Sequence, residues 1–274
     1  MAKQALRLLV LFVITLSFCG CSKQYQSERI LYKATKLART ILISPEAVAP
    51  QEFERTAGLY RTIFEKYADT QSARRARIAL GGLYLSKKEY EEARGIFKKV
   101  LELYPDDKGA CIEAHFAIGK SYESEDMWPK AVTEYRKIMD GYAETEMALS
   151  LPMYIASKDN NYDSAILYYT KLTKEYPQSE LGFRAENFIV MCYVKKEDWL
   201  QAEKGLEKLV MDYPMAKNLA LSLRMIANIS TQRLNNPDTA RTFFKSFLEK
   251  HPEHPLKEYL EKGLEAIENV SIEK

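Results

Sequence analysis

The stretch that decides the fold is residues 80–105, LGGLYLSKKEYEEARGIFKKVLELYP. Its second half places a small residue and two apolar residues on one face of a helix. These are Ala93, Phe97 and Val100. The helix must end at Tyr104, because Pro105 has no N–H and disfavours a helical residue before it. The stretch therefore predicts a helix that buries one face against a neighbour.

The same skeleton returns along the chain at a regular interval. The five further copies are Thr56/Tyr60/Ile63, Ala131/Tyr135/Ile138, Ala165/Tyr169/Leu172, Ala202/Leu206/Leu209 and Ala240/Phe244/Phe247. An aromatic residue or histidine closes each copy, at Tyr67, Tyr104, Tyr142, Tyr176, Tyr213 and His251. The spacings of these closing residues are 37, 38, 34, 37 and 38 residues. A fixed period in this range indicates an array of helical repeats.

A second helix is predicted before each of these segments, and its residues complete a known pattern. The residues that carry it are Leu80, Gly81, Tyr84, Ala93, Phe97 and Pro105, and then Ile118, Gly119, Tyr122, Ala131 and Tyr135. They resemble the tetratricopeptide repeat (TPR) signature at its usual offsets. Tyr193, Ala202 and Pro214 give a partial third match. The resemblance implies an all-α, TPR-type superhelical solenoid over residues 27–270, with about six antiparallel helix pairs and a C-terminal capping helix.

Four segments predict details of this array. Residues 28–44 form an opening helix, and residues 256–268 form a closing helix with Tyr259, Leu260, Leu264 and Ile267 directed inward. Such end helices shield the terminal repeats from water. Pro152 predicts a short or kinked first helix in its repeat. The run from Leu234 to Pro237 predicts a longer turn in the last repeat.

The first twenty residues have a different character. Lys3 and Arg7 are followed by an apolar run over residues 8–18. This run is too short for a bilayer core of about 30 Å, which requires roughly 20 residues. It is typical of an export signal, so residues 1–20 are predicted to be a signal peptide.

The end of this segment, Phe18-Cys19-Gly20-Cys21, resembles the lipobox of bacterial lipoproteins. The resemblance implies a cut after Gly20, a lipidated Cys21 and a tether over residues 21–26. Cys19 is a weaker acceptor, because bulky Phe18 would then occupy the small-residue site. The remaining alternatives are an ordinary signal peptide and an uncut anchor with incidental cysteines.

In the lipoproteins that this segment resembles, the residue after the lipidated cysteine determines the membrane to which the protein is sorted. An aspartate there retains lipoproteins in the inner membrane, and Ser22 stands in that place. We therefore expect the chain at the periplasmic face of the outer membrane, held by its lipid. The chain holds 40 Lys and Arg against 38 Asp and Glu, and loss of the signal removes two of the basic residues. A mature chain near neutrality disfavours nucleic-acid binding, which depends on neutralising phosphates.

No motif for catalysis or for a cofactor stands out. Gly119-Lys120-Ser121 resembles the end of a phosphate-binding loop, but Ala114 occupies the position of the first glycine. His251 and His254 lie among prolines, where they indicate a structural turn, since zinc requires three or four converging ligands. Cys111 and Cys192 are predicted to be buried thiols. We expect no cofactor, metal or small-molecule substrate and a non-enzymatic protein.

The functional surface of such an array is the concave groove that the first helices line. The repeat register directs seven residues toward it: Arg75, Ile78, Glu113, Phe116, Lys120, Arg184 and Asn187. This mixed set suits an extended peptide, or a helix or loop of a partner. It differs from the two-asparagine clamp of some cytosolic TPR proteins, because Ile78 and Gly82 occupy positions where that clamp needs polar residues.

A lipid-anchored array with Tyr-Pro repeat ends resembles the BamD family of outer-membrane lipoproteins. The resemblance implies a scaffold for envelope proteins in outer-membrane protein assembly. The alternative is a TPR lipoprotein for pilus secretin assembly, or for coordinating cell-wall synthesis with constriction at division. A third hypothesis, a small-ligand-binding protein or enzyme, predicts a deep polar pocket with converging ionisable residues.

Overall fold

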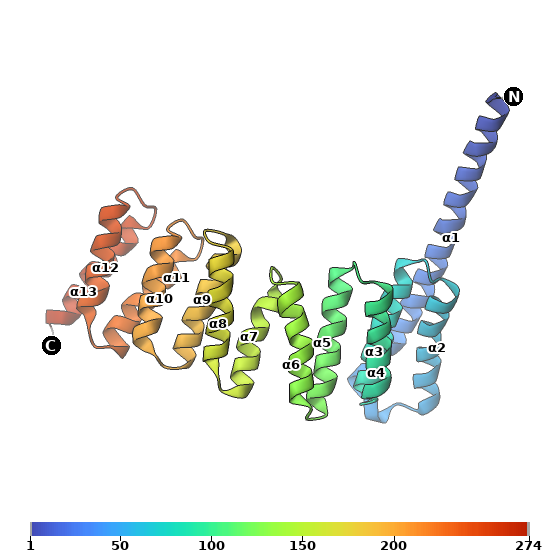
Figure 1. The fold of residues 1–274 in the computed structure, drawn as a ribbon, viewed down its shortest axis with the longest axis horizontal. Coiled ribbons are helices and arrows are strands. Elements are labelled where there is room, and N and C mark those ends of the chain that lie inside the picture. Colours follow the sequence, from blue (N-terminus) through green and yellow to red (C-terminus); the bar gives the residue numbers. More distant parts are fainter. Residues whose placement is uncertain (1, 273–274) are drawn as a thin grey trace. The chain divides into compact units, whose positions relative to one another are not determined.

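The computed structural model describes the backbone of residues 2–272 and the side chains of residues 23–267. Over that part of the chain the secondary structure is helical, without strands, and thirteen α-helices follow one another along the sequence (Figure 1). They form six helix pairs and one C-terminal helix. The predicted all-α solenoid of helix pairs is confirmed.

The helices alternate between the two positions of a pair. The first helices are α1 (Ala2–Ile43), α3 (Gln71–Ser86), α5 (Lys108–Ser124), α7 (Glu146–Asp159), α9 (Glu180–Lys195) and α11 (Leu219–Asn228). The second helices are α2 (Pro50–Lys66), α4 (Tyr90–Leu103), α6 (Trp128–Gly141), α8 (Tyr162–Glu175), α10 (Trp199–Asp212) and α12 (Pro237–Lys250). The last helix is α13 (Lys257–Ile272), and a short 3-10 helix, η1 (Pro45–Ala47), follows α1. The chain divides into two compact units, Met1–Ala148 and Leu149–Lys274.

The small and aromatic positions of the repeat fit together as the sequence predicts. A Cβ atom on Gly81 would lie 2.6 Å from the Phe97 ring, and one on Gly119 would collide with the Tyr135 ring. Glycine therefore allows each ring to pack directly on the backbone of the first helix. Phe97 and Tyr135 are almost completely buried as a result.

A left-handed residue closes the turn within each of five helix pairs. These residues are Lys88, Asp126, Asn160, Glu197 and Asn235, with φ between 49° and 62°. The next N–H then reaches back to a carbonyl at the end of the first helix, as Glu89 does to Tyr84 at 3.0 Å. This hydrogen bond is that of a Schellman cap, which satisfies a carbonyl that the helix leaves unpaired.

The last pair differs from its predicted form. Its turn is no longer than the others, because α12 begins at Pro237 after only three turn residues. The extra residue lies instead in a π-helical turn, η2 (Ile229–Arg233), at the end of α11. The N–H of Asn236 consequently reaches back six residues, to Ser230 at 2.7 Å, where the other pairs reach back five. A single inserted residue is commonly accommodated as a π turn.

Three further predictions about the array can be compared with the structure. Pro152 lies inside α7, which has 14 residues where α5 has 17, so the predicted short helix is confirmed. Leu260 and Ile267 of α13 are buried as predicted. Tyr259 was predicted to point inward, but 41% of it is exposed, because it lies at the edge of the packed face.

The opening helix extends beyond its predicted start. Its helical backbone runs from Ala2, and it ends at Ile43, one residue before the predicted end. The side chains of the predicted signal peptide and of Cys21 lie outside the described residues, so processing and lipidation stay predictions. A search of the described residues finds no helix that is both long and apolar enough to span a membrane.

Candidate partner-binding groove

The first unit contains a groove of about 600 Å³ along its first helices. α1 contributes Thr35, Ala38, Arg39 and Leu42, α3 contributes Arg74, Arg75, Ile78, Ala79 and Gly82, and α5 contributes Gly109, Ala110 and Glu113. Tyr60 of α2 completes the lining. The groove thus lies on the face that a helical repeat array uses for binding.

The floor of the groove is apolar and partly without side chains. Ala38 and Tyr60 are buried beneath it, and Ile78 packs on the core of the unit. A Cβ atom on Gly82 would meet no other atom within 4 Å, so open space lies directly above the backbone of α3. A bound chain could therefore approach this backbone closely.

Charged side chains border this floor. Arg74 forms an ion pair with Asp107, and Arg75 pairs with Glu28, whereas Arg39 is exposed and forms no ion pair among the described residues. Burial raises the pKa of Glu113, and the nearby charge of Arg74 partly opposes this rise. The lining itself carries three arginines and one carboxylate, and the carboxylates of Asp107 and Glu28 at its border neutralise two of the arginines.

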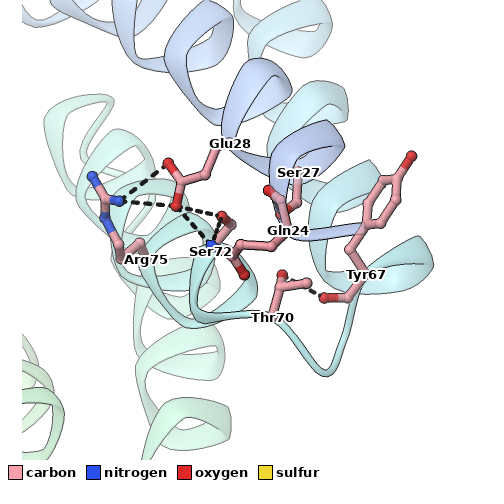
Figure 2. Close-up of polar contacts among 7 residues, drawn as sticks. All are labelled: Gln24, Ser27, Glu28, Tyr67, Thr70, Ser72 and Arg75. Carbon is pink, nitrogen blue, oxygen red and sulfur yellow. Dashed lines mark hydrogen bonds and ion pairs between the residues drawn. The ribbon is translucent and has the colours of Figure 1, made fainter. Parts of the chain in front are cut away.

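Figure 2 shows how Arg75 is held at the edge of the groove. Nη1 of Arg75 lies 3.3 Å from Oε1 of Glu28, and the same oxygen accepts hydrogen bonds from Ser72 at 2.9 Å and from Gln24 at 3.0 Å. Glu28 and Gln24 belong to α1, whereas Ser72 and Arg75 belong to α3. This network joins the two helices. Gln24 lies within the predicted tether, and in the structure it is part of α1.

The turn that leads into α3 is fixed by its own hydrogen bonds. Thr70 donates its hydroxyl to the carbonyl oxygen of Tyr67 at 2.7 Å, and both residues lie beside the network (Figure 2). The hydroxyl of Tyr67 in turn donates to Gln26 of α1 at 3.0 Å. The start of α3, which carries Arg74 and Arg75, is therefore held in place from two sides.

The structure brings three of the seven predicted groove residues together: Arg75, Ile78 and Glu113. Phe116 and Lys120 lie farther along α5 and do not line this groove. The Phe116 ring is half-buried, 5.8 Å from the Tyr135 ring, and Lys120 pairs with Glu123 at 2.9 Å. Whether any of the seven contacts a partner stays a prediction.

Arg184 and Asn187 belong to α9 in the second unit, where both are half-buried. Asn187 donates its side-chain amide to the carbonyl oxygen of Phe183 at 2.8 Å, one turn earlier in the helix. A hollow of about 630 Å³ in this unit is lined by Phe183 and Tyr213 among others, but by neither predicted residue. The second unit thus offers no comparable grouping of the predicted set.

Among the residues of the groove that the sequence did not predict are its two other arginines, Arg39 and Arg74. Arg39 was missed because α1 was interpreted as an end cap, whereas it occupies the place of a first helix in a pair. The signal was present: Thr35, Arg39 and Leu42 recur at helical spacing on the side of α1 next to its buried face. Arg74 adjoins Arg75 and pairs across to Asp107, the residue that caps α5.

His115 binds Glu134 across the contact between α5 and α6. Nδ1 of His115 lies 2.8 Å from Oε2 of Glu134, and Lys137 lies 2.8 Å from the other oxygen. Burial would raise the pKa of Glu134, but these two hydrogen bonds outweigh it and lower the pKa below its ordinary value. The arrangement joins two helices and contains no nucleophile.

The two cysteines and His254, the other candidate metal ligands, have surroundings that indicate a structural role. Cys111 and Cys192 are buried free thiols as predicted, and burial raises the pKa of Cys192 to about 11. Nε2 of His254 lies 2.7 Å from the carbonyl oxygen of Pro214, and its Nδ1 accepts the N–H of Leu256 at 3.1 Å. Within residues 23–267 no three histidine, cysteine or acidic residues are grouped as a metal site would require.

Family comparisons agree with the repeat pattern. Two family descriptions, both named tetratricopeptide repeat, match residues 44–108 and residues 153–179 and 218–254. No curated protein matches the chain. The chain therefore contains tetratricopeptide repeats, which typically serve as protein–protein interaction scaffolds.

Several solved structures resemble the chain. PilF of Pseudomonas aeruginosa is 21% identical with a TM-score of 0.38, over 65% of this chain and 76% of that one. The TPR2AB domain of yeast Sti1 in complex with pHSP90 is 12% identical with a TM-score of 0.37, over 89% and 99%. The Naa15/Naa10 structure bound to HypK-THB is 15% identical with a TM-score of 0.38, over 86% and 39%.

Proposed function

We propose that this chain is a non-enzymatic scaffold of the bacterial envelope, anchored by a lipid on Cys21, that binds a segment of another envelope protein in the groove of its first unit. The observation that carries the proposal is the groove in which Arg75, Ile78 and Glu113 come together. Its apolar floor and its border of mixed charge suit an extended segment that carries both apolar and charged residues.

The groove favours a polypeptide over a small substrate. Two of its three arginines already pair with Asp107 and Glu28, so their charges do not converge on one point. The open space over Gly82 leaves the groove accessible at the backbone of α3. Enzymes and small-ligand proteins instead bury most of the ligand and direct a few polar groups at it.

The proposed location and cellular role of this scaffold are inferred from the sequence. The lipobox at Cys21 and the Tyr-Pro repeat ends resemble the BamD family, which supports a role in outer-membrane protein assembly. The same features support the alternative, a lipoprotein for pilus secretin assembly or for coordinating cell-wall synthesis. The periplasmic face of the outer membrane is the proposed location in either case.

A photo-crosslinking amino acid at position 78, in the full-length chain expressed in cells, tests the groove. Position 98 on α4, where Lys98 is exposed, is the matched control. We expect position 78 alone to crosslink a component of the barrel-assembly machine. A pilus secretin or a cell-wall synthesis protein at position 78 would support the alternative role. Equal labelling at both positions, or none at 78, would contradict binding in the groove.

Metabolic labelling with a palmitate analogue tests the anchor separately. The wild-type chain and Cys19→Ala should incorporate the label, whereas Cys21→Ala should not. Label that survives Cys21→Ala and disappears in Cys19→Ala would move the anchor to Cys19. The absence of label from all three chains would leave only the ordinary signal peptide or the uncut anchor.

A further inference from the structure

The exposed side of α1 is basic over its whole described length. Eight exposed residues define this α1 outer face: Tyr25, Arg29, Tyr32, Lys33, Lys36, Arg39, Thr40 and Ile43. They recur at intervals of three and four residues, so they share one side of the helix. The opposite side carries Leu31, Ala34, Ala38 and Ile41, which are buried in the core of the unit.

The positive charges of this face belong to two arginines and two lysines. None of Arg29, Lys33, Lys36 and Arg39 forms an ion pair among the described residues. The one acidic residue on the described part of α1 is Glu28, which lies off this face and is bound to Ser72 and Arg75 (Figure 2). The charge of the α1 outer face is therefore free for an external anion.

Exposed aromatic rings lie between these charges. Tyr25 is 66% exposed and Tyr32 is 74% exposed, and the guanidinium of Arg29 lies 5.9 Å from the centre of the Tyr25 ring. Ile43 ends the face with 80% exposure. Tyrosine is favoured at membrane–water interfaces, because its ring is apolar and its hydroxyl is polar.

The geometry points to an anionic phospholipid surface as the partner of the α1 outer face. From Tyr25 to Ile43 the face runs for about 27 Å at 1.5 Å per residue, long enough to contact many headgroups. The proposed lipid attachment residue comes four residues before Tyr25 in the sequence. A lipid chain and a basic patch together hold proteins more firmly to membranes than either does alone. This inference rests on the proposed membrane attachment, but it assigns a role to residues that the attachment does not use.

A bilayer contact on this face would also orient the scaffold. Arg39 belongs both to the α1 outer face and to the lining of the groove, whereas Ala38 beside it lies in the groove floor. α1 would then separate the lipid surface from the groove. The groove would remain open to proteins while the helix lies on headgroups.

Lysine footprinting of the full-length chain on vesicles tests this inference. The chain is reconstituted into phosphatidylcholine vesicles, or into vesicles that also contain phosphatidylglycerol, and recovered by flotation. Acetylation of Lys33 and Lys36 is then compared with that of Lys66 and Lys98, which are exposed elsewhere in the unit and form no ion pair among the described residues. We expect Lys33 and Lys36 to react at least fivefold more slowly than the reference lysines on the anionic vesicles alone.

Two charge variants sharpen the test. Arg29→Gln with Arg39→Gln leaves both reporter lysines in place, and Arg55→Gln with Arg136→Gln removes two exposed arginines elsewhere. Each cation near an anionic surface strengthens binding by roughly fivefold. The first variant should therefore lose most of the protection, and the second should keep it.

The possible outcomes separate this inference from the proposed anchor. A chain that floats with both vesicle types, but whose Lys33 and Lys36 stay as reactive as the references, would overturn the lipid contact and leave the anchor standing. If the same footprinting in native membranes shows protection that the vesicles with phosphatidylglycerol do not, the lipid contact is overturned in favour of an acidic protein. A chain that floats with neither vesicle type would overturn the attachment and the inference together.

Discussion

Glu28 of α1 and Arg75 of α3 form an ion pair at 3.3 Å that joins the first helix of the chain to the edge of the groove. The same carboxylate accepts a hydrogen bond from Ser72, which is buried. Both charged side chains are partly exposed, so the ion pair itself contributes little to stability. The hydrogen bond to Ser72 contributes more, because a buried hydroxyl that loses its acceptor is unfavourable.

Glu28→Ala should therefore lower the free energy of unfolding by about 1 to 2 kcal/mol, mainly through Ser72. Denaturant titration measures this loss. Glu52→Ala removes an exposed glutamate on α2 whose side chain forms no ion pair among the described residues, and it should change little. Equal losses in the two variants would show that the network does not hold α1 on α3.

Gly81→Ala should destabilise the first unit by about 1 to 3 kcal/mol, because the new methyl group would overlap the Phe97 ring. Gly95→Ala should instead stabilise the unit, since a Cβ there meets nothing within 4 Å and alanine favours a helix by about 1 kcal/mol over glycine. The thermal unfolding midpoints of the two variants, each compared with that of the wild type, measure these changes. Changes of the same sign would contradict the close approach of ring and backbone.

His254→Phe should lower the free energy of local unfolding at the C-terminal end of the second unit by about 1 to 3 kcal/mol. Phenylalanine keeps an aromatic ring there but cannot form the hydrogen bonds to Pro214 and Leu256. His251→Phe is the matched control, since the His251 ring packs on Phe247 and forms no side-chain hydrogen bond among the described residues. Hydrogen exchange of α13 reports the effect locally. Unchanged exchange in His254→Phe would exclude a capping role for this histidine.

Glu207→Gln should stabilise the chain at neutral pH and lose that advantage in acid. Burial, and then the neighbouring Glu203, raise the pKa of Glu207 in the fold above its ordinary value of 4.5. The folded state therefore binds this proton more tightly, and wild-type stability falls as the pH rises through the raised pKa. Denaturant midpoints from pH 4 to pH 8 measure the difference, with Glu249→Gln as an exposed control. A constant difference across this range would contradict the assignment.

The repeat pattern predicted most of the fold, because each copy specifies its own packing. Tyr135 and Gly119 are brought together by neighbouring helices, so their contact follows from spacing alone. The π turn at Ile229–Arg233 could not be predicted from the repeat spacing, since one inserted residue fits equally well in a longer turn between the helices. Its position depends on the packing of α11, which the local sequence does not show.

The groove was predictable in part, and the limit is again physical. Ile78 and Glu113 follow from the register of repeats whose helix pairs are evident. Arg39 required the knowledge that α1 packs as the first helix of a pair, which depends on contacts with α2 and α3. The pairing of His115 with Glu134 depends on the rotation of α5 against α6, and no spacing in the sequence reports it.

The left-handed residues in the turns have a consequence for engineering the chain. Asp126 and Glu197 hold φ at 57°, in the left-handed region. This region costs residues other than glycine about 1 to 2 kcal/mol, and aspartate less than glutamate. Both are exposed, and neither side chain forms a hydrogen bond or an ion pair among the described residues. Glycine at these two positions would relieve that strain without touching a packed surface. The turns are therefore places where heat tolerance can be raised while the groove and the α1 outer face stay as they are.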